Sequence, residues 1–311
     1  MGTDIGSNRP LIALTGGTGF VGQMVVELAS ARGMAVKGLA RREPSSARGV
    51  TWVAGDLANR RALAELVDGV EAVIHVAGVV NAADPAEFAI ANVDGTLAVL
   101  EAAKAAGVSR FIFVSSLSAR EPNLSQYGAS KARAEQYVKA SGLDWTIVRP
   151  PAIYGPRDRE MFELFRAAKW GVVPVPAGGH ASLIHVEDLA RLLLALVPGG
   201  EAVTSHTFEP DDGEPGGWSN DDMARAIGAA LGRKPFVPHL SRWMLVCAAW
   251  CDQRLRGAKA KLTMDRVGYM AHPDWVVSPA AAVPPEVWQP RIEARGGLSA
   301  TAEWYRREGW F

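Results

Sequence analysis

The chain has little cysteine or histidine, the two residue types that most often bind transition metals. Its 311 residues include two cysteines, Cys247 and Cys251, and six histidines. The cysteines are one helical turn apart in an apolar run, which favours a pair packed in a core over a disulfide or a metal-binding pair. The histidines are scattered and none stands beside the cysteines, so we predict no metal site.

An excess of charge of either sign is also absent. Lysine and arginine together number 33, as do aspartate and glutamate. This balance argues against the strongly basic surface of a nucleic-acid-binding protein and against an acidic, disordered chain. We therefore expect a globular protein without a nucleic-acid partner.

Long apolar runs are missing as well. A membrane-spanning helix needs about 20 apolar residues, whereas the longest candidate, WMLVCAAWC at 243–251, has nine. The N-terminal sequence MGTDIGSNRP lacks the basic and then apolar order of a signal peptide. It also has Gly6 where myristoylation requires serine or threonine. We expect a cytoplasmic protein.

What the chain does contain is an alternation of two apolar patterns. Short apolar runs predict buried strands at 11–16, 34–40, 50–56, 71–78, 110–116 and 144–150. Helical periodicity predicts helices between them, at 20–33, 59–69, 85–107 and around residue 127. Alternating strands and helices form βαβ units, so we predict an α/β fold with a doubly wound parallel sheet.

A glycine-rich turn joins the first strand to the first helix. The sequence TGGTGFVG at 15–22 has glycines at a spacing of three, which allows a tight turn and close approach of the helix to the sheet. The N-terminus of the helix then offers free N–H groups to a pyrophosphate. A purely conformational role for the glycines is the alternative. We predict a dinucleotide site formed by Gly16, Thr18, Gly19, Phe20, Val21 and Gly22.

The end of the second strand indicates which dinucleotide binds. Enzymes specific for NAD place a carboxylate there to bind the ribose hydroxyl, whereas arginine suits the 2′-phosphate of NADP. This chain has Arg41 and Arg42 in the sequence GLARRE. Charges on a solvated loop are the alternative interpretation. We predict NADP(H) as the cofactor.

Tyr127 and Lys131 are four residues apart in the helical sequence SQYGASKARAE. Side chains at this spacing share one face of a helix, whether they form a surface pair or a catalytic pair. The spacing alone does not distinguish the two.

In combination, these motifs resemble the extended or atypical branch of the short-chain dehydrogenase/reductase superfamily. That branch includes sugar-nucleotide epimerases and dehydratases and 3β-hydroxysteroid dehydrogenases. The similarity covers roughly residues 10–190. It runs through TGGTGFVG, HVAG at 75–78, NVDGT at 92–96, FVSSLS at 113–118, YGASK at 127–131, RPPAIYGP at 149–156 and SLIHVEDLA at 182–190.

The resemblance implies roles for residues beyond the glycine-rich turn. Tyr127 is the implied general acid/base, Lys131 its activator and Ser116 the hydrogen-bond donor to the reacting oxygen, with Asn92 on the proton-relay side. Ser118 and Tyr154 are implied to contact the substrate. Besides Tyr127 and Lys131, the implied cofactor contacts are Asp56, Leu57, Val76, Ala77, Gly78, Pro150 and Ile153.

The chemistry of these side chains agrees with the implied roles. A free phenol has a pKa near 10, about three units too high for efficient proton transfer at neutral pH. An ammonium about 4 Å away would lower it by a comparable amount. A serine hydroxyl would stabilise charge on the reacting oxygen. We therefore interpret Tyr127 and Lys131 as a catalytic pair.

The sequence departs from the sugar-nucleotide enzymes near this pair. Only 11 positions separate Ser116 from Tyr127, which leaves little protein to enclose a nucleotide sugar. We therefore expect a reductase or dehydrogenase acting on a carbonyl or secondary alcohol of a bulky, apolar substrate, such as a 3-oxo-sphingoid base, an oxoceramide or a steroid-like alcohol. A sugar-nucleotide epimerase or dehydratase and a non-catalytic, nucleotide-bound assembly subunit are the alternatives. A homodimer through a helix pair is common in the superfamily.

The organisation of the chain follows from these patterns. We predict a Rossmann domain over residues 1–165, with a returning segment at about 180–208. A smaller substrate-binding lobe would comprise residues 209–311 and about 166–179. SNDDMARAIGAALG at 219–232 predicts an amphipathic helix of that lobe.

The lobe also contains an apolar block followed by basic residues, RWMLVCAAWCDQRLRGAKAK at 242–261. One interpretation is a core helix with a solvated basic end formed by Arg254, Arg256, Lys259 and Lys261. The other is an apolar rim that receives a lipid-like substrate from a membrane surface. The second would add peripheral contact with the inner face of the membrane.

Overall fold

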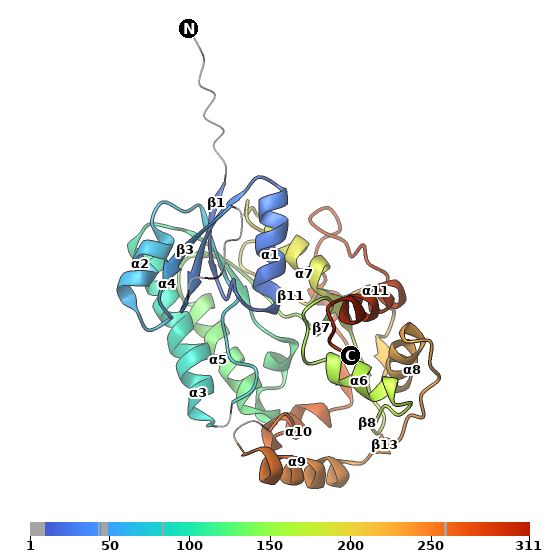
Figure 1. Cartoon of the computed structure of the whole chain (residues 1–311). Coiled ribbons are helices and arrows are strands. Elements are labelled where there is room, and N and C mark those ends of the chain that lie inside the picture. The colour runs from blue at the N-terminus through green and yellow to red at the C-terminus, as the bar shows by residue number, and fades with distance from the viewer. Residues whose placement is uncertain (1–9, 43, 45–48, 83, 258–259) are drawn as a thin grey trace.

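A seven-stranded parallel sheet forms the centre of the larger part of the protein (Figure 1). The computed structural model describes residues 10–42, 44, 49–82, 84–257 and 260–311. The N-terminal sequence discussed above, except Pro10, and Lys259 lie outside these residues. The strand order is β3-β2-β1-β4-β5-β6-β11, which is the doubly wound arrangement of a Rossmann fold.

The six strands expected from the sequence are all confirmed. They are β1 (Leu11–Thr15), β2 (Ala35–Ala40), β3 (Val50–Ala54), β4 (Ala72–His75), β5 (Arg110–Val114) and β6 (Asp144–Val148). Their central members are buried on both faces, which explains their continuous apolar sequences. The seventh strand, β11 (His206–Phe208), comes from much later in the chain and pairs with β6 in parallel.

Helices cover both faces of the sheet. Helix α1 (Phe20–Ala31) and helix α7 (Val186–Ala195) pack on one face in a shared apolar cluster. On the other face, α2 (Arg60–Val67), α4 (Gly95–Ala105) and α5 (Gln126–Lys139) contribute to a second cluster. The predicted α/β fold with a doubly wound parallel sheet is therefore correct.

The helix predicted at 85–107 is interrupted. The structure has a short helix α3 (Ala86–Phe88), a π-helical segment η1 (Ala89–Asp94) and only then α4. A π-helical turn widens the helix by one residue and commonly occurs at functional sites. Here it contains Asn92, one of the predicted site residues.

A smaller lobe is built mainly from the C-terminal part of the chain. Helices α6 (Phe162–Lys169), α8 (Asn220–Ala230) and α11 (Ala294–Arg307) enclose a third apolar cluster. The predicted helix at 219–232 is confirmed as α8, and its N-cap Ser219 accepts a hydrogen bond from the Asp222 N–H. Short strands outside the large sheet form three small sheets of their own. Strand β7 (Ala152–Tyr154) pairs with β10 (Leu183–His185), and β8 (Val175–Pro176) pairs with β13 (His239–Leu240). Strand β9 (His180–Ala181) lies between β12 (Trp218–Ser219) and β14 (Asp274–Trp275). The domain limits given above stay a prediction.

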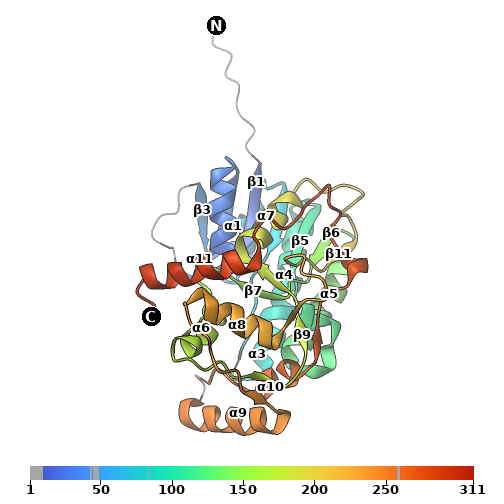
Figure 2. The same ribbon diagram turned by 90° about the vertical axis from the view of Figure 1, so that its right-hand side faces the viewer.

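Helices α9 (Arg242–Arg256) and α10 (Met264–Met270) pack together at the end of the molecule farthest from β1 in Figures 1 and 2. The prediction of a core pair of cysteines is wrong, because Cys247 and Cys251 are both exposed on α9. Only Leu245 and Ala249 of this helix are buried. The core-helix interpretation of residues 242–261 is therefore also wrong.

Two kinds of feature are absent from the described residues. No helix there has both the length and the apolar character needed to cross a membrane. The same ranges contain no cluster of three or more His, Cys, Asp or Glu placed to hold a metal ion.

Candidate active site

A large cleft runs from the carboxyl ends of the sheet strands into the smaller lobe. Its volume is about 1870 Å³, beyond the roughly 300–1,000 Å³ of a typical small-ligand pocket. In doubly wound sheets, ligands bind at this edge of the sheet. The size and position of the cleft suit a dinucleotide together with a second molecule.

Most of the residues predicted to bind the cofactor line this cleft. They are Gly16, Thr18, Gly19, Phe20, Val21, Gly22, Arg41, Asp56, Leu57, Val76, Ala77, Gly78, Tyr127, Pro150 and Ile153. Ser116 and Ser118 line it as well. Arg42, Lys131, Asn92 and Tyr154 are not among the lining residues.

The glycine-rich turn is shaped by close backbone contacts. Gly16 has a φ of 73°, and a Cβ there would lie 2.7 Å from the backbone nitrogen of Ala77. A Cβ on Gly22 would lie 2.1 Å from the carbonyl oxygen of Gly16. Glycine is therefore required at both positions. The turn places the N-terminus of α1 against the cleft without a side-chain cap at Gly19, an arrangement that fits a pyrophosphate.

The end of β2 brings one of the two predicted arginines to the cleft. Arg41 and Arg42 both follow β2 and are exposed, but only Arg41 lines the cleft. The structure thus supports Arg41 rather than Arg42 as a contact to the adenosine ribose.

Ser116, Tyr127 and Lys131 come from two neighbouring segments. Ser116 follows β5 and caps the short 3₁₀ helix Leu117–Arg120, where its Oγ accepts a hydrogen bond of 3.2 Å from the Ser118 N–H. Tyr127 and Lys131 lie in the first half of α5, whose N-cap is Ser125. The Nζ atom of Lys131 donates to the Val114 carbonyl at 2.9 Å and lies 4.9 Å from the centre of the Phe113 ring.

The acidities of this pair differ from the expectation given above. Burial raises the pKa of Tyr127 to about 12, a hydrogen bond with Ser116 opposes the rise, and the phenol of Tyr269 adds to it. Burial also lowers the pKa of Lys131 to about 8, although the carboxylate of Glu135 raises it. The expected lowering of the phenol pKa is therefore not present. Tyr127 is a protonated phenol at neutral pH, as a proton donor must be.

Asn92 holds the backbone rather than lining the cleft. Its Oδ1 accepts from the Val79 N–H at 2.7 Å, and its Nδ2 donates to the Val79 carbonyl and to Ser130 Oγ, both at 2.9 Å. Ser130 in turn donates to the Tyr127 carbonyl at 2.7 Å. Through these bonds Asn92 fixes the chain after β4 against helix α5. It therefore positions the segment that carries Tyr127.

Tyr154 does not occupy the place predicted for it. Its side chain is fully buried in the apolar cluster of the smaller lobe, packed edge-on against His185, and its hydroxyl reaches the Ala294 carbonyl at 3.5 Å. The reason is the direction of β7, which points this side chain away from the cleft while Ile153 lines it. The structure does not support Tyr154 as a substrate contact.

Helix α10 contributes residues that the sequence analysis missed. The Asp265 carboxylate accepts hydrogen bonds from the backbone N–H groups of Gln126 at 2.5 Å and Tyr127 at 3.4 Å, which docks α10 on the N-terminus of α5. Tyr269 consequently lies close to Tyr127, with ring centres 6.5 Å apart.

Arg266 donates to the Tyr269 hydroxyl at 3.1 Å and pairs with Glu160 at 2.6 Å. Tyr269, Arg266 and Glu160 all line the cleft.

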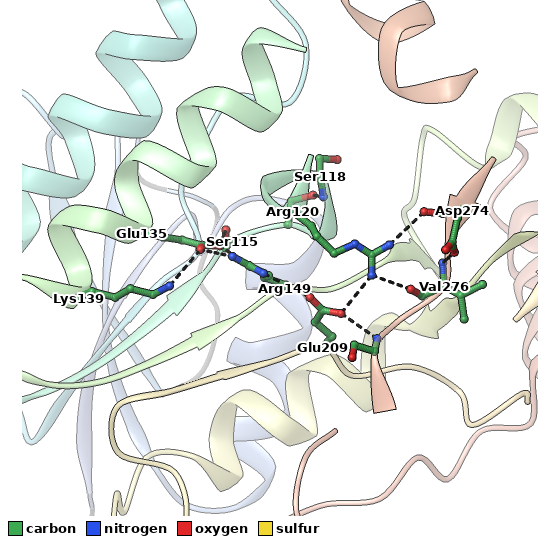
Figure 3. A network of polar contacts seen from close by, with 11 residues as sticks. Ser115, Ser118, Arg120, Glu135, Lys139, Arg149, Glu209, Asp274 and Val276 are labelled. Atoms are coloured by element: carbon green, nitrogen blue, oxygen red, sulfur yellow. Dashed lines mark hydrogen bonds and ion pairs between the residues drawn. The ribbon is translucent and has the colours of Figure 1, made fainter. Parts of the chain in front are cut away.

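A largely buried ionic network includes Glu135 of helix α5 (Figure 3). Arg149, just after β6, pairs with Glu135 of α5 at 2.6 Å and with Glu209 at 3.4 Å. Glu209 also pairs with Arg120 at 3.5 Å, and Arg120 donates to the carbonyls of Asp274 and Val276. The network joins α5 to the segment after β14 and so ties the smaller lobe to the helix that carries Tyr127.

Comparisons with known proteins agree with this geometry. The model of the NAD dependent epimerase/dehydratase family matches residues 12–208. The chain is 37% identical over 311 residues to a ceramide reductase of Caulobacter vibrioides, which covers 97% of this chain and 96% of the relative. It is 30% identical to a 3-beta-hydroxysteroid dehydrogenase of Mycolicibacterium neoaurum over 75% of this chain and 72% of the relative.

Solved structures show the same fold. The UDP-glucose 4-epimerase of Thermus thermophilus, in complex with NAD, superposes with a TM-score of 0.71 and 22% identity, over 95% of this chain and 99% of the epimerase. At this identity the likeness concerns the fold alone. The family match covers more than half of the chain and includes every motif from the glycine-rich turn to β11. The chain therefore belongs to the NAD dependent epimerase/dehydratase family.

Proposed function

We propose that the protein is an NADP(H)-dependent reductase that transfers hydride between the nicotinamide and a carbonyl or secondary alcohol of a bulky, lipid-like substrate. The observation that carries this proposal is the cleft itself. It places Ser116 and Tyr127 between the dinucleotide-binding turn and a lobe whose lining includes Leu164, Met223, Leu262, Met270, Trp275 and Trp310. An oxo-lipid, such as a 3-oxo-sphingoid base or an oxoceramide, would place its carbonyl at Ser116 and Tyr127 and its apolar chain against these lobe residues. The similarity to a ceramide reductase supports the same substrate class.

The side chains of the site account for the proton transfer. A bound nicotinamide supplies the hydride. Tyr127, a phenol that is protonated at neutral pH, gives its proton to the carbonyl oxygen of the substrate. Ser116 already accepts a hydrogen bond from the Ser118 N–H, so its hydroxyl hydrogen can point to the same oxygen and stabilise the charge that develops there. The Lys131 ammonium stabilises the phenolate that remains.

The cofactor preference follows from Arg41. An arginine at the end of β2 binds a phosphate through charge-assisted hydrogen bonds. We expect the R41A variant to bind NADPH more weakly by about 1–3 kcal/mol, with NADH affinity nearly unchanged. The R42A variant is a matched control, because Arg42 is equally exposed but does not line the cleft. Titrations of NADPH and NADH measure both effects, and equal affinity of the unmodified protein for the two cofactors would contradict the preference.

The substrate class is tested by following NADPH oxidation against two panels of compounds. One contains 3-oxo-sphingoid bases, oxoceramides and steroid ketones, and the other contains nucleotide sugars. We expect turnover with an oxo-lipid and none with a nucleotide sugar. Isomerisation of a nucleotide sugar without net NADPH consumption would instead support an epimerase. Absence of all turnover with bound nucleotide would support an assembly subunit.

Cellular placement follows from the substrate. Lipids of this class reside in membranes, so we propose a cytoplasmic protein that contacts the inner face of the membrane peripherally. A homodimer through a helix pair, as is common in the superfamily, is part of the same proposal. Light scattering of the purified chain measures the oligomeric state.

A further inference from the structure

Helix α9 presents an apolar face to solvent. Trp243 is 68% exposed, Trp250 56% and Leu255 85%. Cys247 and Cys251 are exposed between them. At about 3.6 residues per turn these positions share one side of the helix, and the buried residues Leu245 and Ala249 lie on the other. We call the first group the outer face of α9.

This arrangement is the reverse of an ordinary surface helix. Helices of globular proteins normally turn their apolar side inward, and contiguous exposed apolar patches mark interaction sites. In both views of the molecule α9 forms the end opposite β1, and no other element lies beyond it (Figures 1 and 2). Within the described part of the chain, nothing covers the outer face.

The charges around the outer face are basic. Arg242 begins the helix, and the guanidinium of Arg254 lies 4.9 Å from the centre of the Trp250 ring. Arg256, the last residue of the helix, is neutralised by Asp252. Asp252 is the only acidic residue of the helix, and it is directed to the protein. It pairs with Arg256 at 3.2 Å and accepts the backbone N–H groups of Lys261 and Leu262. Tryptophan and leucine with flanking arginines are typical of helices that lie in the interface of an anionic membrane.

The chain that follows α9 leads directly into the cleft. Lys261 and Leu262 line it, as do Arg266 and Tyr269 of α10. The Ala260 carbonyl accepts a hydrogen bond of 3.3 Å from Asn81, which holds this connection against the loop after β4. In that loop Val80 lines the cleft with an exposed side chain. The outer face of α9 (Arg242–Arg256) and residues 260–270, several of which line the cleft, are thus close together in the sequence.

We propose that the outer face of α9 docks the protein on an anionic lipid surface, so that a membrane-resident substrate enters the cleft past residues 260–270. The docking surface depends on α9 alone. Only the identity of the substrate that enters the cleft rests on the proposed function. A second copy of the chain is a poorer occupant. A twofold contact centred on Trp250 would bring two copies of Arg254 together, because Arg254 lies beside that ring. A single helix face is also small beside the roughly 800 Å² per partner of a stable interface.

The test is flotation of the full chain with phosphatidylcholine vesicles that contain or lack phosphatidylglycerol. We expect binding to the anionic vesicles that weakens as salt is raised. The triple variant W243S/W250S/L255S should lose about tenfold or more in affinity, since it removes the largest apolar side chains of the outer face. The W170S variant is the matched control, because Trp170 is 85% exposed but lies outside α9. It should bind as the unmodified protein does.

Several results would overturn the proposal. The first is that the triple variant still binds anionic vesicles, and the second is that W170S loses as much vesicle affinity as the triple variant does. The third is that the unmodified protein forms a dimer that does not bind vesicles and that dissociates in the triple variant. A short-chain, water-soluble ketone separates this proposal from the reductase activity. If the triple variant reduces it normally but fails with substrate in vesicles, docking is supported. If the unmodified protein binds vesicles but reduces no ketone, the proposed function fails and the docking surface stands.

Discussion

Replacement of Tyr127 with phenylalanine should lower turnover by about 10²- to 10⁴-fold, the usual worth of general acid/base catalysis. The variant loses only the phenolic O–H. Its ring keeps the contacts with Phe88 and Tyr269, whose ring centres lie 6.2 and 6.5 Å away. Melting temperature and NADPH affinity should therefore stay as they are while the rate of NADPH oxidation falls. Y137F is the control, because Tyr137 lies on the same helix but faces solvent.

The pH dependence of a second variant separates acid/base catalysis from simple packing. K131M should also lose activity, because the phenolate would form without a neighbouring ammonium. In the direction of alcohol oxidation, raising the pH toward the phenol pKa should partly restore K131M, since the phenol then ionises unaided. It should not restore Y127F, which has no proton to lose. Near-normal activity of Y127F on the true substrate would show that Tyr127 is not the general acid/base.

The large sheet could be predicted because its signals are local. Strands buried on both faces, such as β4 and β5, require continuous apolar sequences, and each is followed by a helix of clear periodicity. The strands of the smaller lobe have only two or three residues and pair with distant partners, as β9 does with β12 and β14. Segments of that length have no periodicity to recognise, so the sequence analysis did not find them.

The same difference between local signals and tertiary contacts separates the site residues that could be predicted from those that could not. Residues at the ends of β1 and β2 were predicted from the glycine-rich turn and from the residues that follow the second strand, and those after β4 and β5 from motifs shared with the family. Tyr269 and Arg266 were missed because their place depends on one tertiary contact, the capping of α5 by Asp265 across 139 positions of sequence. No motif marks such a contact. The aspartate that follows Thr263 is an ordinary residue for the first turn of a helix.

Two further errors concern burial. The rule that apolar residues pack inward misplaced Cys247 and Cys251, since α9 turns most of its apolar residues to solvent. The expected effect of Lys131 on Tyr127 considered the ammonium but not the desolvation of both groups, which dominates both pKa values. A sequence shows which charges are neighbours on a helix, whereas the cost of burial depends on the packed structure.

The largely buried network that includes Glu135 of α5 should make Arg149 one of the most sensitive positions for stability. Its guanidinium neutralises the carboxylates of Glu135 and Glu209, which are both buried. Hydrogen bonding to Glu135 in particular raises the pKa of Arg149 above its ordinary value. Removing one partner of a buried ion pair typically costs about 3–5 kcal/mol, because the remaining charge is left unpaired. After the change R149M, Glu209 keeps Arg120, whereas Glu135 keeps the Ser115 hydroxyl and the more exposed Lys139.

We therefore expect R149M to lower the free energy of unfolding by about 3–5 kcal/mol near neutral pH. An unpaired buried carboxylate has a raised pKa, so the folded variant takes up a proton as the pH falls, and the difference from the unmodified protein should shrink in acid. Urea unfolding at two pH values measures both effects. R225M is the control, because Arg225 is exposed and pairs with Asp221 at 3.0 Å on the surface, a contact worth at most about 1 kcal/mol. Equal losses in R149M and R225M, or a loss in R149M that grows in acid, would mean that the network does not stabilise the contact between α5 and the smaller lobe.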